Sequence, residues 1–258
     1  MKEIPDNSID LVVTDCPYRI VSGGCTNIPR KDEPRGIFNR RSTFTQKNSK
    51  SGKLFDCNDI KFEQWLPDVY RVLKEESHCY IMINARNLKN LQVQSEKAGF
   101  KFQQLLVWNK GNATPNRYYL NACEFILMLR KGKAKNINNM GTKSILSIPN
   151  IRGGKSHPTE KPVELMKIFI ENSSNEGDTV LDPFMGSCPT GEACANTNRY
   201  FIGMELDEKY FNIAQKRINT KLERKVSECQ TRLFTVKVAE GRRATPPLLK
   251  PPREVRIS

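Results

Sequence analysis

The chain has 258 residues, 38% of them hydrophobic, and its mean hydropathy is −0.58. No apolar run approaches the roughly 20 residues that a membrane-spanning helix needs, which argues against a membrane protein and predicts a soluble one. Residues 1–6 lack the apolar centre of a signal peptide, and the eight cysteines form no Cys-x-x-Cys pair. With only two histidines, these features predict free thiols, a cytoplasmic location and no zinc site.

The formal net charge of +14 is concentrated in two segments. Residues 19–53 carry nine lysines and arginines against two acids, and residues 221–258 carry ten against four. The rest of the chain is nearly neutral. A neutral core with two basic appendages is typical of a protein that binds a polyanion such as nucleic acid. For the second segment, a tail that only increases solubility is an equally good interpretation.

Apolar spacing along the rest of the chain predicts alternating strands and helices, and therefore a mostly parallel sheet covered by helices on both faces. Pro67 and Pro162 are expected in the first turns of two helices, with Thr159 as the N-cap of the second. In chain order, we expect strands over 9–14, 78–84, 103–108, 124–129, 179–182 and 200–205, and helices over 62–73, 86–98, 162–170, 191–197 and 207–219.

Three segments lack such a pattern. Residues 19–53 form a long polar stretch without periodicity, which in a compact domain is usually functional or disordered. Residues 131–156 are polar and contain four glycines, which predicts a loop or a small appended element. Residues 221–258 are basic and rich in proline, and we expect them to be disordered apart from a strand-like island at 233–238.

A first candidate site follows the strand predicted over residues 9–14. Asp15 supplies a strong acceptor, the backbone carbonyl of Cys16 is restrained by the following Pro17, and Tyr18 offers a ring for stacking. In open α/β sheets, ligands bind at the carboxyl ends of the strands. The set suits a planar group that bears an NH2, although a plain strand and turn would also explain these four residues.

A second candidate site links the strand that ends at Asp182 to the helix predicted from Gly191. Glycines let the backbone approach a ligand, and a helix N-terminus offers free N–H groups. Glu205 ends the next strand, where an acid in a nucleotide-binding βαβ unit bonds ribose hydroxyls. The loop is neither a Walker A motif nor a dinucleotide fingerprint. It favours a ribose-containing cofactor without a pyrophosphate, such as S-adenosylmethionine.

These segments resemble the motifs of DNA amino-methyltransferases. Residues 15–18 (Asp-Cys-Pro-Tyr) resemble the catalytic Asp-Pro-Pro-Tyr motif, and residues 182–187 resemble the cofactor loop. Residues 157–162 are similar to the His-Pro-Thr-x-Lys-Pro segment that leads into the helix before that loop. The catalytic motif precedes the cofactor loop, as in the permuted beta class. Further matches lie at 71–74, 108–110, 124–127, 201–205 and 210–211, so that the resemblance spans about residues 3–219.

The resemblance implies a Rossmann-like, S-adenosylmethionine-dependent methyltransferase sheet, mostly parallel with one antiparallel strand, in a catalytic domain over 1–220. It implies methylation of double-stranded DNA with the target base flipped out, and a homodimer is a candidate assembly. Residues 19–53 and 131–156 would read the target sequence. The implied catalytic residues are Asp15, Cys16, Pro17 and Tyr18, and the implied cofactor-binding residues are Asp182, Pro183, Phe184, Gly186, Ser187, Glu205, His157, Thr159 and Lys161.

The sequence departs from the family pattern at three places. Cys16 replaces the commoner proline, which leaves the required carbonyl in place, and Cys188-Pro189 replaces Gly-Thr in the cofactor loop. Family members usually carry a strand and Gly-Asp before the position of Met1. We expect either that the chain is truncated there or that another segment fills that edge of the sheet, with residues 233–238 as a candidate. Asp15 favours adenine N6 as the methyl acceptor. The alternatives are cytosine N4 and a non-catalytic DNA-binding relative.

Overall fold

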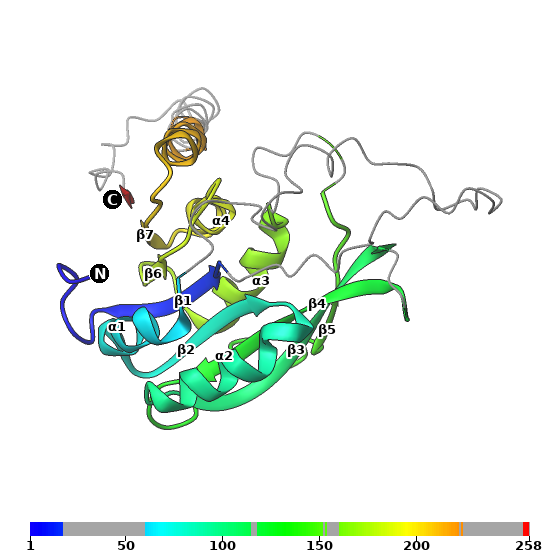
Figure 1. Cartoon of the computed structure of the whole chain (residues 1–258). Coiled ribbons are helices and arrows are strands. Elements are labelled where there is room, and N and C mark those ends of the chain that lie inside the picture. Colours follow the sequence, from blue (N-terminus) through cyan, green and yellow to red (C-terminus); the bar gives the residue numbers. More distant parts are fainter. Residues whose placement is uncertain are drawn as a thin grey trace, which may run out of the picture. The chain divides into compact units, whose positions relative to one another are not determined.

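The computed structural model describes residues 1–17, 60–114, 118–151, 153, 160–221, 223 and 255–257 (Figure 1). Contacts divide the chain into two units, one formed by Met1–Cys16 with Phe62–Ser258 and the other by Pro17–Lys61. The first unit contains all of the helices and strands described below. Within the described residues, no helix has both the length and the apolar character needed to cross a membrane.

One eight-stranded sheet organises the first unit, in the order β5-β3-β4-β2-β1-β6-β7-β8. Only β4 runs antiparallel to its neighbours β2 and β3, and every other pair is parallel. This confirms the mostly parallel sheet with one antiparallel strand. The strands are β1 (Ile9–Asp15), β2 (Leu73–Ile83), β3 (Lys101–Thr114), β4 (Asn121–Arg130), β5 (Ile145–Ser147), β6 (Thr179–Asp182), β7 (Tyr200–Gly203) and β8 (Val255–Ile257).

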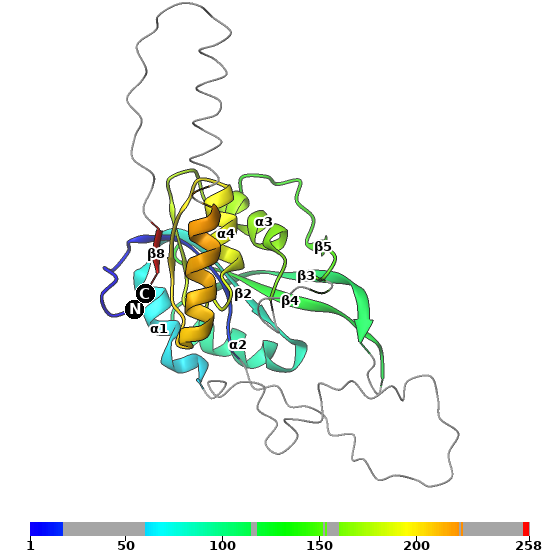
Figure 2. The same cartoon turned by 90° about the horizontal axis from the view of Figure 1, so that it is seen from above.

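Helices cover both faces of the sheet (Figures 1 and 2). A short 3-10 turn η1 (Phe62–Gln64), α1 (Leu66–Val72) and α2 (Ala85–Lys97) lie on one face. On the other face, α3 (Val163–Ser173), α4 (Pro189–Asn196) and a helix over 208–221 enclose the main hydrophobic core. The alternation of strand residues decides which side chains enter this core: Leu11 and Val13 of β1 join it, whereas Val12 is buried on the opposite face.

Several boundaries differ from those expected. β2 begins at Leu73, five residues early, because Leu73 pairs with Ile9 before the register shifts to the pair Leu11 and His78. β3 continues to Thr114, since its polar end pairs with β4 as one long hairpin. Pro162 is the N-cap of α3 rather than part of its first turn. The residues at these element ends show no apolar periodicity, so the boundaries could be located only from strand pairing and packing.

The edge of the sheet beside β7 is occupied by β8, whose three residues pair in parallel with 201–203. Val255–Ile257 thus form a strand in a part of the tail for which the sequence predicted disorder. The strand-like island at 233–238 lies outside the described residues, as do most of the basic tail and all of the basic segment 19–53.

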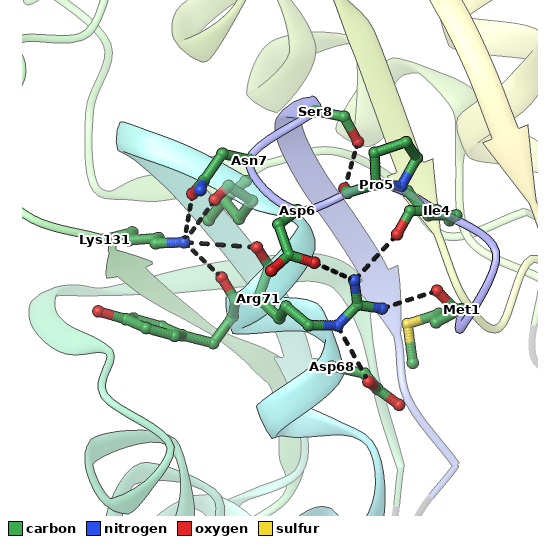
Figure 3. A network of polar contacts seen from close by, with 11 residues as sticks. Met1, Ile4, Pro5, Asp6, Asn7, Ser8, Asp68, Arg71 and Lys131 are labelled. Atoms are coloured by element: carbon green, nitrogen blue, oxygen red, sulfur yellow. Dashed lines mark hydrogen bonds and ion pairs between the residues drawn. The ribbon is translucent and has the colours of Figure 1, made fainter.

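Two cations, the half-buried Arg71 and the buried Lys131, connect the first eight residues to the end of α1 (Figure 3). Arg71 donates to the carbonyl oxygens of Met1 and Ile4, both at 2.9 Å, and pairs with Asp6. Lys131 is buried and donates to the side chain of Asn7 and to the carbonyls of Tyr70 and Leu73, each at 2.8 Å. Lys131 opens the segment expected to read DNA, but its ammonium is used in holding the strand β1 in place.

Candidate active site

Asp15 ends β1 near the centre of the sheet, and its two carboxylate oxygens have different surroundings. Oδ2 lies 2.6 Å from Nζ of Lys161, whose side chain is only 7% exposed. Oδ1 is buried and accepts no hydrogen bond from any described residue. Burial raises the pKa of Asp15, Lys161 lowers it, and the neighbouring Glu124 carboxylate raises it. One oxygen is therefore fixed by an ion pair, and the other is an acceptor without a donor.

Cys16 follows directly and is buried, with its thiol 3.7 Å from the carbonyl oxygen of Met82. Burial, followed by the charge of Asp15, raises the pKa of this thiol. The side chain therefore packs as a small neutral group. Pro17 belongs to the second unit, and Tyr18 lies outside the described residues.

Asp182, at the end of β6, uses both carboxylate oxygens within the protein. Oδ1 accepts from Thr14 Oγ1 at 2.7 Å and from the backbone N–H of Phe184 at 3.1 Å. Oδ2 accepts from Thr190 Oγ1 at 2.7 Å. Burial raises the pKa of Asp182 to about 6, although these hydrogen bonds act in the opposite direction. Asp182 thus shapes the loop, and its bond with Thr14 ties the end of β6 to the end of β1.

The loop after β6 is closed against the end of β7. Glu205 accepts from the backbone N–H of Gly186 at 3.0 Å and from those of residues 206 and 207, each at 2.9 Å. Ser187 is buried, and its Oγ has no hydrogen-bond partner among the described residues. Phe184 packs edge-on against Trp65, with 5.1 Å between the ring centroids. A ligand at this loop would meet a ready hydroxyl donor and a fixed carboxylate.

The structure explains how the loop accommodates Cys188-Pro189. Cys188 is the N-cap of α4 in the left-handed conformation (φ 66°), and its side chain is fully buried in the main core. Pro189 lies in the first turn, where its missing N–H costs nothing. A Cβ at Gly191 would lie only 2.3 Å from the Cys188 sulfur and 2.8 Å from the Phe201 ring. Glycine at 191 is therefore what makes room for the cysteine.

Lys161 lies beside Asp15 at the end of β1. It precedes α3, and it also lies 3.4 Å from Glu124 Oε2, while Lys110 lies 3.2 Å from Glu124 Oε1. The neighbouring residue Glu160 is buried and pairs with Arg217 at 2.7 Å. Sequence reasoning did not assign Glu124, Lys110, Arg217, Thr14 and Thr190 to the site, because each is identified only by the partner that the fold places beside it.

The remaining residues that the sequence predicted at the site either are buried within the loop or lie outside the described residues. Pro183 is buried within the loop. His157 and Thr159 lie outside the described residues, as does Tyr18. In the part of the chain that the structure describes, no group of three or more His, Cys, Asp or Glu side chains could share a metal ion.

Comparisons with known proteins agree with this architecture. Residues 9–216 match the model of the N6/N4 methyltransferase family, described as DNA methylase. The chain is 28% identical to the type II methyltransferase M2.DpnII of Streptococcus pneumoniae over 86% of its length and 87% of the relative. It is also 28% identical to M2.LlaDCHI of Lactococcus lactis subsp. cremoris, over 85% of each chain. The crystal structure of the M1.HpyAVI–SAM complex is similar, with 27% identity, a TM-score of 0.59, and coverage of 84% of this chain and 91% of that one.

Proposed function

The chain belongs to the DNA methylase family, and from this premise we propose that it transfers a methyl group from S-adenosylmethionine to an exocyclic amine of a DNA base, most specifically adenine N6. When bound, S-adenosylmethionine supplies an electrophilic methyl group on a sulfonium. The chain's own residues must then activate the amine, hold the two reactants together and bind DNA. Because the relatives are named type II methyltransferases, a role in restriction–modification is part of the proposal.

The observation that carries the proposal is the unpaired Oδ1 of Asp15. An exocyclic amine is a poor nucleophile because its lone pair is delocalised into the base. A hydrogen bond from the amine to Oδ1, and a second one to the carbonyl of Cys16, would localise that lone pair and stabilise the positive charge that develops on nitrogen. A buried acceptor without a donor costs about 1–3 kcal/mol of stability, so its presence at a strand end indicates a ligand partner.

The residues of the cofactor loop fit S-adenosylmethionine. The unpaired Oγ of Ser187 can hydrogen-bond a polar ligand, and Gly186 allows the backbone to approach it. Glu205 keeps lone pairs available for ribose hydroxyls beyond the three backbone N–H groups that it accepts. We expect Ser187 and Glu205 to bind the cofactor, whereas Asp182 stabilises the loop by accepting hydrogen bonds from Phe184 and Thr190.

The two sites lie at adjacent strand ends, as a transfer reaction requires. β1 and β6 pair in register at Val12 and Leu181, and Thr14 donates to Asp182 across the same pair of strands. Asp15 and the cofactor loop are thus connected through one hydrogen bond between neighbouring strands. Such an arrangement lowers the entropic cost of aligning methyl donor and amine.

The hairpin of β3 and β4 is the described surface that best suits DNA. Met82 pairs with both Asp15 and Ile126, so β4 extends five residues beyond the level of Asp15, about 17 Å for an extended strand. The hairpin reaches beyond the neighbouring strands in Figure 2. Its tip carries Tyr119, which is 90% exposed, between the exposed Tyr118 and Leu120. When a base is flipped out of the duplex, the neighbouring base pairs lose a stacking partner, and an aromatic ring can take its place.

Labelled-methyl transfer to DNA tests the proposal. We expect the wild type to label duplex DNA and Asp15→Ala to lower the rate by at least about 100-fold, since an acceptor aimed at developing charge is lost. Glu164→Ala, an exposed acid in the first turn of α3, is the matched control and should retain the wild-type rate. Equal labelling by wild type and Asp15→Ala would refute the catalytic assignment. Chromatography of the labelled nucleosides separates N6-methyladenine from N4-methylcytosine.

A further inference from the structure

We propose that Lys161 is a positioning residue for Asp15, which fixes one carboxylate oxygen so that the other faces the target amine. This assignment rests on the proposed function for the role of Asp15 itself. It replaces the cofactor-binding role that the sequence suggested for Lys161.

The Lys161 ammonium is placed between two carboxylates. It lies 2.6 Å from Oδ2 of Asp15 and 3.4 Å from Oε2 of Glu124. Oε2 has no hydrogen-bond partner among the described residues, so the second contact is a longer ion pair. Lys110 pairs with the other oxygen of Glu124 at 3.2 Å. The four groups alternate in sign and sum to zero, so removal of any one leaves an uncompensated charge in a largely buried place.

The backbone of Lys161 is itself held from several sides. Pro162 follows as the N-cap of α3 in an extended conformation (φ −61°, ψ 133°), and α3 packs against β1 and β2. The preceding residue, Glu160, pairs with Nη1 of Arg217 at 2.7 Å, and the same nitrogen donates to the carbonyl of Ser187 at 3.1 Å. Two successive buried charges therefore contact the catalytic carboxylate on one side and, through Arg217, the cofactor loop on the other.

This geometry divides the work between the two oxygens of Asp15. With Oδ2 engaged, rotation of the carboxylate would break a short ion pair, so Oδ1 stays where an amine can donate to it. The ionised form is also the one that accepts the N–H strongly. Burial and Glu124 raise the pKa of Asp15, and Lys161 lowers it. A second acid, Asp182, is connected to the end of β1 by the hydrogen bond that it accepts from Thr14. The buried Cys16 thiol stays neutral because burial raises its pKa.

The test compares the pH dependence of methyl transfer in four variants. Lys161→Met should lower the rate near neutral pH by about 10- to 100-fold and move the acid limb of the profile to higher pH. Glu124→Gln should move that limb to lower pH, and the double variant should lie between the two. Lys161→Arg, which keeps the charge, should retain the wild-type limb and covers the case in which Lys161→Met fails to fold. The matched control is Lys167→Met, a half-buried lysine of α3 whose nearest carboxylate, Glu171, is 3.9 Å away.

Two measurements separate this role from others. Calorimetry should show that Lys161→Met binds S-adenosylmethionine within about twofold of wild type, and a large loss of affinity with an unmoved acid limb would restore the cofactor-binding role and overturn the proposal. The carboxyl carbon of Asp15, assigned in NMR spectra with Asp15→Asn, should titrate at higher pH in Lys161→Met. An unchanged titration would overturn it as well. This titration needs no turnover, so failure of the ion-pair role is distinguishable from failure of the catalytic role.

Discussion

Two unpaired polar atoms mark the two halves of the site at the level of single residues. Oδ1 of Asp15 and Oγ of Ser187 are both buried without a partner among the described residues. Each is expensive for a folded chain to maintain, because burial removes its bonds with water. Their neighbours, by contrast, are satisfied: Asp182 accepts three hydrogen bonds and Glu205 accepts three. We infer that substrate and cofactor would complete the bonding of these two atoms.

The raised pKa of Asp182 gives a prediction about stability and pH. Burial raises this pKa from 3.8 to about 6, so the folded state binds a proton more readily than the unfolded state between these values. The contribution of this group to the free energy of unfolding therefore decreases as pH rises from 4 to 6, by about 3 kcal/mol in total. Asp182→Asn cannot ionise and should lack this dependence, while its amide can keep the bonds with Thr14, Phe184 and Thr190.

Urea unfolding of both proteins at pH 4, 5, 6 and 7 measures the effect. The wild type should lose stability relative to Asp182→Asn as pH rises through this window. The comparison cancels the titration of all other groups. Parallel curves for the two proteins would show that Asp182 titrates normally in the folded state.

The residue types at the site could be predicted from the sequence, but several of their partners could not. Asp15, Asp182 and Glu205 follow apolar strands, and strand ends are where α/β sheets bind ligands. The ion pair of Asp15 with Lys161 spans 146 positions, and the bond of Thr14 with Asp182 spans 168. Local pattern carries no information on contacts at such separations, so the sequence could not predict that Lys161 pairs with Asp15.

At the level of elements, the β3–β4 hairpin gives a prediction about DNA binding. Tyr119→Ala should weaken binding to duplex DNA by about tenfold, since one base–aromatic stack contributes about 1–3 kcal/mol. Thermal stability should not change, because the ring is 90% exposed. Fluorescence anisotropy with a labelled duplex measures the affinity.

Phe102 provides the control for the hairpin. It lies near the opposite end of β3, is 43% exposed and is of the same aromatic type. Phe102→Ala should leave DNA affinity unchanged, and Tyr119→Trp should retain it. If Tyr119→Ala binds as well as the wild type, the hairpin tip is not a DNA contact.

Element types were well predicted, whereas element ends depended on neighbours. Apolar runs placed β1, β4 and β6 correctly because each is buried by helices on both faces. The polar extension of β3 is stabilised by pairing with β4, and pairing leaves no mark on side-chain polarity. The short strand β5 lies within the segment 131–156, and only its pairing with β3 identifies it.

At the level of the whole molecule, the edge strand β8 gives a further prediction. Val255–Ile257 pairs with β7, whose end leads into Glu205. Replacing these three residues with prolines removes the N–H groups that pair β8 with β7. We expect Tm to decrease by a few degrees, since each kcal/mol of stability lost corresponds to about 2–4 °C. Three alanines retain the ladder and form the control. Scanning calorimetry compares the two, and equal Tm values would mean that the pairing does not contribute to stability.

The order of motifs along the chain does not affect the geometry of the site. Strand β1, which carries the proposed catalytic residue, comes first, and β6, which leads into the proposed cofactor loop, begins 164 residues after β1 ends. The two strands are nevertheless neighbours in the sheet. Parallel strands deliver their carboxyl ends to the same edge whichever is made first. In the sequence, the unit formed by residues 17–61 lies between β1 and η1.

The sequence by itself determined the alternating α/β class, the two strand-end sites and the family resemblance, because apolar period and short motifs are local properties. Only the tertiary structure decided that Lys161 pairs with Asp15, that Asp182 accepts hydrogen bonds from within the protein, and that Val255–Ile257 pair with β7 at the edge of the sheet. The physical reason is the same in each case. Electrostatic and hydrogen-bond partners are chosen by distance in space, and the fold brings together groups that lie more than 140 positions apart.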